Sequence, residues 1–319
     1  MRNASDKPLV VRLRNFVGDV VLGVPALRLL QRHGHSLHLV GKPWASSLLE
    51  AEGWTVEPRP KRLGDRLTQL RRLRAQAAER DPSFDVRPNT VLFPWAFSAA
   101  LDARLAGLKA TGYANEARGW LLHRSLAMPA AGHALLNYWE LACRFLGLDE
   151  APPKEIGLKV SPAQQAAATA LLSRCGVDLD RKFVLLCPFA GGTFEGQAKT
   201  WPQFKQFASL LSRAGHQVVV CPGPGEEAHA VEHYGDAHCL HGVSLGVYSA
   251  LLQRAAIVVG NDTGPMHMAA AVGASVLSIL GPTIPELWAP WGSSVEILRI
   301  HPAWPSPGDV LSRVEQKLD

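Results

Sequence analysis

The polar turn around Asp262 and Thr263 carries residue types suited to holding an anionic ligand. It follows an apolar, β-branched run at residues 257–259 and precedes a small-residue stretch at 266–272, which predicts a buried strand followed by a helix. Pro265 suits the first turn of that helix, because its missing N–H would be unpaired there anyway. The two polar side chains can cap the helix, while first-turn amides that remain free can bind a phosphate.

His267 favours a ligand-binding site over a turn with a purely structural role. It falls in the first turn of the same helix, where the positive end of the helix dipole favours a neutral, hydrogen-bonding imidazole. A single His is more often structural. Here it accompanies an Asp, a Thr and backbone amides at the carboxyl end of a strand, where α/β proteins bind ligands.

The glycine-rich loop 188–202 adds a second set of such groups after the predicted strand 183–187. Its glycines let backbone amides turn toward a ligand, its Thr adds a hydroxyl, and its Lys adds a mobile positive charge. The loop is not a Walker loop, because the G-K-[ST] ending is missing. An exposed loop lysine without function is the alternative. The residues concerned are Gly191, Gly192, Thr193 and Lys199.

Two more loops of the C-terminal half place polar groups at strand ends. Glu226 and Glu227 lie in the loop 221–227, which follows a predicted strand. Either carboxylate could bind ribose hydroxyls. Thr283 follows the strand expected at 275–280. Four loops of this kind in one half of the chain are unlikely to arise by chance, so they predict one shared binding site.

Asp19 is the candidate for chemistry in the N-terminal half. It follows Gly18 in a turn between a strand at residues 9–14 and a helix that runs to about residue 30. The carboxylate either caps that helix or takes a proton from an attacking hydroxyl. The turn holds one Gly, so it lacks the G-x-G-x-x-G fingerprint of dinucleotide-binding proteins.

The length of 319 residues indicates two domains, and 47% hydrophobic with 19% charged residues indicates a globular chain. Strands and helices alternate in both halves, which predicts parallel sheets covered by helices. A Pro-rich linker candidate at 149–154 separates them. We therefore expect an α/β protein with two Rossmann-like domains, 1–150 and 151–319, and a ligand cleft between them. Further expected helices are 19–32, 44–51, 63–80, 162–174, 201–213, 226–233 and 245–255, and further strands 36–40, 90–93 and 217–221.

Positive charge is concentrated in the N-terminal half. The chain has a net charge of +5, whereas residues 1–150 alone carry +7, from 21 Lys and Arg against 14 Asp and Glu. Much of the excess lies between Arg59 and Arg80 at helical spacing, typical of a solvated helix face. An anionic membrane surface or a phosphorylated acceptor is the alternative partner. Nucleic acid is not expected, because no nucleic-acid-binding motif accompanies the charge.

Five cysteines without a C-x-x-C pair are typical of a reduced, cytoplasmic protein without a zinc or disulfide framework. The polar start of the chain, residues 1–7, does not have the pattern of a signal peptide. No apolar run approaches the roughly 20 residues that a membrane span needs.

Three motifs together resemble glycosyltransferase family 9, the ADP-heptose:lipopolysaccharide heptosyltransferases and their relatives. Residues 261–271, with Gly273 and 281–283, are similar to the family's D-[TS]-G-P-x-H-[LM]-A-A signature. Residues 18–27 resemble its opening G-D-[VL]-[VL]…P-A-L, and Lys199 begins a sequence similar to its K-x-W-P loop. The matches extend from about residue 9 to residue 283, and the first is highly specific.

The resemblance implies a GT-B fold, with the sugar nucleotide held mainly by the C-terminal domain and the acceptor by the N-terminal one. It implies an inverting transfer with Asp19 as general base and Lys199 neutralising the leaving diphosphate, without a metal or another cofactor. The last helix is then a candidate to pack back on the N-terminal domain. Together with the loop residues discussed above, the expected donor-binding residues are Gly191, Gly192, Thr193, Glu226 (less favoured, Glu227), Asp262, Thr263, Gly264, Pro265, His267 and Thr283.

The acceptor side departs from the family pattern. Gly18 is retained, but Arg14 and Asn15 stand where the family often has two serines, and residues 16–17 replace a commoner small pair. The acceptor is therefore not identified by the sequence, although Asn15 and Gly18 are the acceptor-side candidates.

These features lead to the hypothesis of a cytoplasmic transferase that moves a heptose from ADP-heptose, or a sugar from another nucleotide-diphosphate sugar. The expected acceptor is a lipid-anchored core saccharide of lipopolysaccharide, reached at the inner face of the inner membrane. A nucleotide-sugar epimerase of similar fold is the first alternative, followed by transfer of another sugar or to another acceptor. A catalytically silent binding protein is a third, against which the presence of both Asp19 and Lys199 argues.

Overall fold

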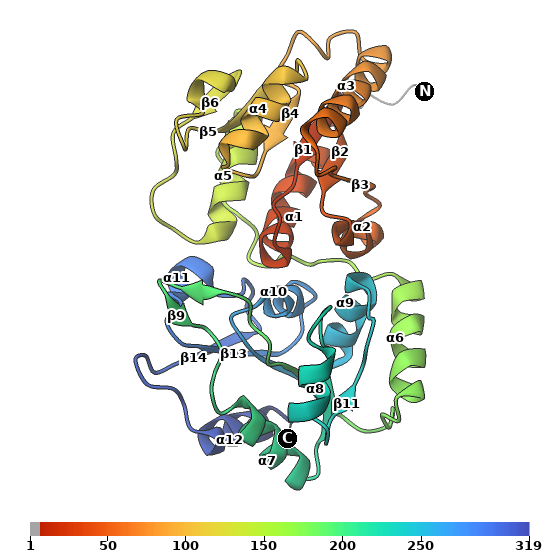
Figure 1. Ribbon diagram of the computed structural model, residues 1–319, viewed down its shortest axis with the longest axis vertical. Helices are drawn as coiled ribbons and strands as arrows, with labels where there is room; N and C mark the ends of the chain where they lie inside the picture. Colours follow the sequence, from red (N-terminus) through yellow and green to blue (C-terminus); the bar gives the residue numbers. More distant parts are fainter. Residues whose placement is uncertain (1–6, 319) are drawn as a thin grey trace. The chain divides into compact units, whose positions relative to one another are not determined.

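The computed structural model describes residues 7–318 and divides into two compact units, Met1–Pro153 and Lys154–Asp319. The polar start of the chain considered for a signal peptide lies almost entirely outside the described residues. Each unit is built on a parallel sheet with helices packed on it (Figure 1). This confirms the predicted α/β class.

The first unit has a six-stranded sheet in the order β3-β2-β1-β4-β5-β6, with every pair parallel. This is the strand order of the doubly wound dinucleotide-binding fold. Its elements are β1 (Lys7–Arg12), α1 (Val17–Arg32), β2 (His35–Gly41), α2 (Trp44–Leu49), the 3-10 helix η1 (Glu50–Glu52), β3 (Val56–Pro58), α3 (Leu63–Arg80), β4 (Thr90–Leu92), α4 (Phe97–Leu105), β5 (Ala110–Tyr113), the 3-10 helix η2 (Gly119–Leu121), β6 (Arg124–Leu126) and α5 (Ala134–Leu146).

Apolar side chains on both faces of β1 fix this sheet between two helical layers. Val10 packs into a cluster with Leu73 of α3 and Ala103 of α4. Leu9 and Val11, also fully buried, point to the opposite face because side chains alternate along a strand, and α1 and α5 pack together there. A strand buried on both faces reads as a continuous apolar run, as β1 does.

The second unit repeats the same plan with the order β11-β10-β7-β12-β13-β14, again parallel throughout. A separate antiparallel hairpin, β8-β9, is inserted after β7. Its elements are α6 (Pro162–Arg174), β7 (Phe183–Cys187), β8 (Thr193–Phe194), β9 (Gln197–Ala198), α7 (Phe204–Arg213), β10 (Gln217–Val220), α8 (Glu227–His233), β11 (His238–Cys239), α9 (Leu245–Arg254), β12 (Ile257–Asn261), α10 (Gly264–Ala271), β13 (Val276–Leu280), α11 (Pro285–Trp288), β14 (Val295–Arg299) and α12 (Pro307–Leu318).

Helices α7 and α12 pack together on one face of this sheet, and their aromatic and aliphatic side chains form a core with it. Trp201, expected to begin a helix, is instead buried ahead of α7, which starts at Phe204. Its indole N–H donates to the carbonyl of Pro305 at 3.2 Å. The last helix, α12, buries Val310 and Val314 in this same core of the second unit.

The strand and the helix on either side of the turn before Asp19 have other boundaries than the sequence predicted. Strand β1 ends at Arg12 and helix α1 begins at Val17, so Arg14 lies in the connecting loop and Asp19 lies inside the helix. Between β4 and the linker, where the sequence supported no specific elements, the chain forms α4, β5, η2, β6 and α5. These elements complete the sheet and supply a side chain that contacts Asp19.

Candidate active site

The loops that carry Lys199, Asp262 and Asp19 follow central strands of their sheets. In the second unit, residues 188–202 follow β7 and residues 262–263 follow β12, and these two strands are neighbours at the point where the strand order reverses. Ligands of open α/β sheets bind outside the carboxyl ends of the strands at this switch point. The loop before α1 follows β1 at the equivalent point of the first unit.

Asp262 is the centre of a polar network that joins three of the four predicted loops. Its Oδ2 lies 3.1 Å from the Nζ of Lys199 and accepts a hydrogen bond of 2.8 Å from the hydroxyl of Thr283. The Lys199 and Asp262 side chains are 19% and 11% exposed, while Thr283 is fully buried. Lys199 is therefore an oriented cation rather than a free loop lysine, and Thr283 holds the carboxylate that orients it.

Helix α10 begins beside this network without a side-chain cap. Thr263 is the N-cap residue, but its hydroxyl makes no capping hydrogen bond, and Asp262 uses its carboxylate elsewhere. The capping role considered for these two side chains is thus wrong. Gly264 and Pro265 are half-buried, and His267 is buried at 7% exposure in the first turn. An uncapped helix start beside a lysine favours a negatively charged ligand.

Asn261 is a buried residue of this site that the sequence did not single out. Its Oδ1 accepts from the backbone N–H of Trp201 at 2.9 Å, and its Nδ2 donates to the carbonyl of Pro188 at 2.5 Å. It ties both ends of loop 188–202 to the end of β12, which fixes the base of the Lys199 segment. The sequence did hold a signal for this residue, because a polar side chain directly follows an apolar strand.

The glycine-rich loop is more ordered than expected, because it folds back on itself as the β8-β9 hairpin. Glu195 and Gly196 at its turn both have positive φ angles, 49° and 78°, as a tight type I′ turn requires. Gly191, Gly192 and Thr193 are exposed. Their backbone is open to a ligand, and Lys199 follows directly after the second strand of the hairpin.

Glu226 and Glu227 both brace the loop before α8. Glu226 accepts a hydrogen bond from the backbone N–H of Gly223 at 2.8 Å, and Glu227 accepts one from Gly225 at 2.7 Å. Each uses one carboxylate oxygen in this way and remains half-buried. The geometry gives neither residue an advantage for contact with a ribose.

In the first unit, the carboxylate of Asp19 is held by two residues (Tyr138 and Arg14). Asp19 is the third residue of α1, whose N-cap is Phe16, so the helix-capping alternative for Asp19 is wrong. The Tyr138 hydroxyl donates to Asp19 Oδ1 at 2.6 Å, and Arg14 Nε lies 3.4 Å from Oδ2. Burial, and then the neighbouring carboxylate, raise the pKa of Tyr138 well above its ordinary value, so the phenol stays a donor. The Asp19 side chain is 10% exposed.

Arg14 and Tyr138 are the residues of this site that the sequence did not assign. The guanidinium of Arg14 lies 4.9 Å above the ring of Trp95, a cation–π contact that fixes its position beside Asp19. Tyr138 lies on α5 and approaches Asp19 because α5 packs on α1. The hydrophobic pattern of α5 could have predicted a buried tyrosine, but not its partner 119 residues away.

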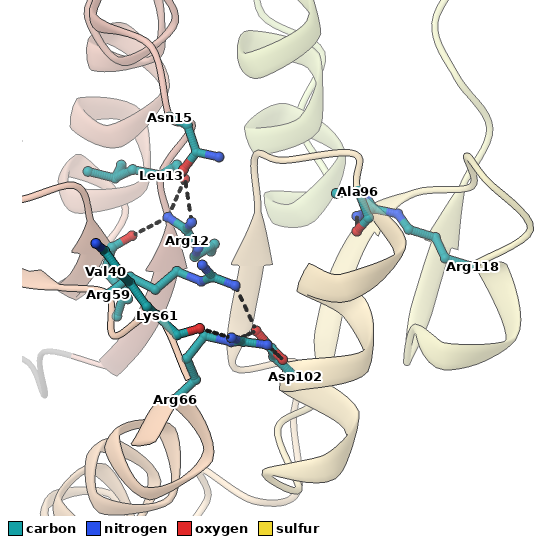
Figure 2. Close-up of polar contacts among 10 residues, drawn as sticks. All are labelled: Arg12, Leu13, Asn15, Val40, Arg59, Lys61, Arg66, Ala96, Asp102 and Arg118. Carbon is teal, nitrogen blue, oxygen red and sulfur yellow. Dashed lines mark hydrogen bonds and ion pairs between the residues drawn. The ribbon is translucent and has the colours of Figure 1, made fainter. Parts of the chain in front are cut away.

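The two acceptor-side candidates differ in what they contribute. Gly18 is buried within the first turn of α1. The exposed Asn15 accepts a hydrogen bond from Arg12 at 3.1 Å, and Arg12 also donates to the carbonyls of Leu13 and Val40, as Figure 2 shows. Burial and the nearby Arg59 lower the pKa of Arg12 to about 10. Asn15 thus has a polar anchor at the end of β1.

Four arginines of the basic stretch that starts at Arg59 form ion pairs within the first unit. Arg66 and Arg59 both contact the buried Asp102, with nearest distances of 2.7 and 3.3 Å (Figure 2). Farther along α3, Arg72 pairs with Glu57 and Arg74 with Asp85. These arginines fasten α3 to the rest of the unit, so only part of the charge excess is available to an anionic partner.

Among residues 7–318, no group of three or more His, Cys, Asp or Glu is arranged to hold a metal ion. Over the same residues, no helix is both long and apolar enough to cross a bilayer.

Known proteins share this architecture and part of this sequence. Heptosyltransferase II of Escherichia coli, described as an ADP-heptose lps heptosyltransferase, superposes with a TM-score of 0.79 over 98% of both chains at 22% identity. Lipooligosaccharide heptosyltransferase 2 of Haemophilus influenzae is 31% identical over 170 residues, 48% of this chain and 46% of that protein. The aligned segment thus spans about half the length of this relative. Lipopolysaccharide heptosyltransferase 2 of E. coli K12 is 24% identical over 90% of this chain and 86% of its own length.

Two doubly wound α/β units of this kind define the GT-B class of fold. The sequence model described as "Glycosyltransferase family 9 (heptosyltransferase)" matches residues 92–318. The chain belongs to this family. The matched region contains Lys199 and Asp262, while Asp19 precedes it.

Proposed function

We propose that the protein is an inverting heptosyltransferase that moves a heptose from ADP-heptose to a saccharide acceptor of lipopolysaccharide. Family membership supports glycosyl transfer, and the names of the relatives support this donor and acceptor class. The observation that carries the proposal is the Lys199 ammonium, held 3.1 Å from Asp262 beside the uncapped start of α10. A fixed cation and free helix-start dipoles suit a diphosphate leaving group.

In the proposed mechanism, Asp19 accepts the proton of the acceptor hydroxyl, and the hydroxyl oxygen then attacks the anomeric carbon of the donor. The bond from that carbon to the β-phosphate oxygen breaks, and the electron pair leaves with ADP. Because attack and departure occur on opposite sides, the configuration inverts. Tyr138 and Arg14 hold the base, while Lys199 and the amides near Thr263 and Gly264 stabilise the charge that develops on ADP.

We assign the donor to the second unit and the acceptor to the first. The loops of the second unit carry the groups suited to a nucleotide diphosphate, with Gly191, Gly192, Thr193, His267 and one of Glu226 and Glu227 as further donor contacts. Asp19, with Asn15 and Gly18 nearby, provides the acceptor side. A lipid-anchored acceptor places the enzyme at a membrane surface, which the excess positive charge of the first unit favours.

We also propose that transfer needs no metal ion, since Lys199 and the start of α10 supply positive charge for the diphosphate. Transfer rates measured with and without EDTA should then agree within about twofold, because a step without Lewis-acid assistance does not depend on a bound metal. A rate that collapses in EDTA and returns with one added metal contradicts this part of the mechanism.

A thermal-shift screen of nucleotide sugars tests the donor assignment. ADP-sugars should raise the melting temperature more than UDP- and GDP-sugars at equal concentration, because binding to the native state alone stabilises it. If no nucleotide sugar stabilises the protein, the proposal fails. Product analysis with donor alone separates transfer from epimerisation, since an epimerase converts the sugar without an acceptor.

The Asp19→Asn variant tests the assignment of the base. It should keep the donor-induced thermal shift and lose transfer by about a thousandfold, within the range for removal of a general base. A variant that still transfers heptose at a rate near wild type would remove Asp19 from this role.

A further inference from the structure

An aromatic surface on the first unit has no part in the mechanism above. It consists of Trp120 in η2 and Phe97 at the start of α4, with ring centroids 6.3 Å apart and planes tilted by 57°. The Trp120 side chain is 74% exposed and Phe97 is half-buried. An indole this exposed gains little for folding, which is why exposed tryptophans often mark binding surfaces.

This aromatic pair lies at the same edge of the sheet as Asp19. Phe97 follows β4 and Trp120 follows β5, while Asp19 follows β1, and all three strands are parallel. Their carboxyl ends therefore share one edge, at which doubly wound sheets bind ligands.

Side-chain contacts and one short chain segment connect the pair to the proposed base. Asp19 lies 3.4 Å from Arg14, whose guanidinium lies 4.9 Å above the ring of Trp95. Trp95 precedes Phe97 by two residues, and Phe97 contacts Trp120. Side-chain contacts thus link Asp19 to Arg14 and Arg14 to Trp95, and the short segment 95–97 carries the chain from Trp95 to the aromatic pair.

The backbone that carries the aromatic pair is fixed by a buried arginine. Arg118, with no exposed surface, donates from Nε to the carbonyl of Tyr113 at 2.9 Å and from Nη1 to those of Pro94 and Ala96 at 2.8 and 3.0 Å. Figure 2 shows Arg118 beside Ala96. Arg118 therefore joins the loop after β5 to the loop after β4.

Glu116 adds a second tie, because its carboxylate accepts from the backbone N–H of Phe97 at 2.9 Å. Rings held on a fixed backbone lose little conformational entropy when a ligand binds, so the surface is preorganised.

We propose that Trp120 and Phe97 form a stacking subsite for a sugar ring of an acidic oligosaccharide acceptor, beyond the ring that carries the reacting hydroxyl. The proposal rests on the function proposed above, because that function makes Asp19 the reaction centre. A pyranose ring presents a face of C–H groups with hydroxyls at its rim, which matches an indole with an apolar face and a polar N–H. Arg14, which contacts both Asp19 and Trp95, complements acidic groups of such an acceptor.

A saccharide suits this surface better than a lipid bilayer does. Surfaces that insert into membranes present a broad apolar face, whereas here one exposed indole stands beside a half-buried phenyl ring. The position of the pair at the same sheet edge as Asp19 also places the surface near the acceptor hydroxyl, which a bilayer contact would not require.

The test compares Trp120→Ala and Trp120→Phe with Val86→Ala. Val86 is 75% exposed and precedes β4, so it serves as an exposed apolar control at the opposite edge of the sheet. The probe is a deacylated core oligosaccharide of lipopolysaccharide, with its affinity measured by titration calorimetry and its acceptor KM measured with ADP-heptose as donor.

Trp120→Ala should weaken oligosaccharide binding and raise the acceptor KM by about tenfold, as truncation of an aromatic contact residue commonly does. The donor KM and kcat at saturating acceptor should stay within about twofold, and Trp120→Phe should recover most of the affinity. Val86→Ala should match wild type. An unchanged donor-induced thermal shift in Trp120→Ala shows that the variant is folded.

Other outcomes separate this subsite from the proposed function. Unchanged oligosaccharide affinity in Trp120→Ala, or no binding by wild type, overturns the subsite whether or not heptose is transferred. Binding that depends on Trp120 without any transfer supports the subsite and overturns the function. If the substitution abolishes only sedimentation with phosphatidylethanolamine–phosphatidylglycerol vesicles, the surface is a membrane contact and the subsite is wrong.

Discussion

At the scale of single residues, each proposed reacting group is positioned by partners remote in sequence. Lys199 is paired with Asp262, 63 residues away, and Asp19 is bonded to Tyr138, 119 residues away. In both pairs a further group also contacts the carboxylate, Thr283 in one and Arg14 in the other. Groups fixed in this way need no reorganisation when charge develops in the transition state.

Replacing Lys199 should mainly affect the leaving group. We expect Lys199→Ala to lower kcat/KM by about 100- to 1000-fold, the range for loss of one charge-stabilising donor, and Lys199→Arg to retain part of the activity. Lys205→Ala, which removes an exposed lysine on α7, is the matched control. Steady-state kinetics with ADP-heptose measure the effect. Activity above half of wild type in Lys199→Ala would exclude the proposed role.

Tyr138→Phe should act through Asp19. The substitution keeps the buried ring but removes the 2.6 Å hydrogen bond to Oδ1, a bond to a charged group that is typically worth about 1.5–3 kcal/mol. We expect kcat to fall by about tenfold, with the KM of both substrates nearly unchanged, because the hydroxyl orients the base and binds neither substrate. A Tyr138→Phe enzyme with wild-type kcat would show that this contact is only structural.

At the scale of elements, the candidate site around Lys199 and Asp262 depends on close packing between β7, β12 and α10. A Cβ added at Gly260 would lie 2.7 Å from the Cβ of Cys187 and 2.9 Å from its carbonyl oxygen, and would also meet the sulfur of Met266. The flexible Met can move, but the neighbouring strand cannot without disturbing the sheet. Glycine at this position lets β12 deliver Asn261 and Asp262 to the site.

Gly260→Ala should therefore destabilise the protein by about 1–3 kcal/mol, the usual cost of overpacking a core. Gly191→Ala is the control, since no atom lies within 4 Å of a Cβ there, and it should change stability by less than about 0.5 kcal/mol. Urea denaturation measures both. Equal stability of the two variants would contradict this prediction and would mean that β7 and β12 can move apart to accommodate the added methyl group.

At the scale of the whole molecule, the two units repeat one strand order, yet each carries different chemical groups at its switch point. The first carries a carboxylate suited to activate a nucleophile, and the second carries a cation and a helix start suited to a phosphate.

The first unit also buries histidines in its sheet, His35 at 8% exposure and the half-buried His38, which makes its stability sensitive to acid.

Burial, and then the nearby Arg87, lower the pKa of His35 from 6.5 to about 4. A backbone hydrogen bond with Lys7 raises the pKa of His35, while the charges of Lys7 and His33 lower it. Between pH 6.5 and pH 4 the unfolded chain binds a proton at His35 that the folded chain does not, so the free energy of unfolding falls as pH is lowered through this window.

The loss attributable to His35 should be about 2 kcal/mol between pH 7 and pH 4.5. His35→Gln removes this titration, and its denaturation midpoint should depend less on pH than that of wild type. His123→Gln, at an exposed position of the same unit, should keep the wild-type dependence. Parallel pH profiles for all three proteins would contradict the prediction.

The α/β class, the paired strand–loop–helix units and the loops that carry the candidate site could all be predicted from the sequence. These features depend on short-range patterns: apolar runs for strands buried on both faces, helical periodicity, and Gly, Pro and polar residues at the turns. The sequence also supported the family through motifs that occupy those same turns.

Which side chains contact one another became clear from the folded structure alone. It placed Asp19 inside α1 rather than at its cap, turned Thr283 toward Asp262, and brought in Tyr138, Arg14 and Asn261. The physical reason is that a strand order which is not sequential, together with helix packing across a sheet face, sets these contacts. Neither leaves a periodic signal in the residues themselves, because the partners lie tens to more than a hundred residues apart.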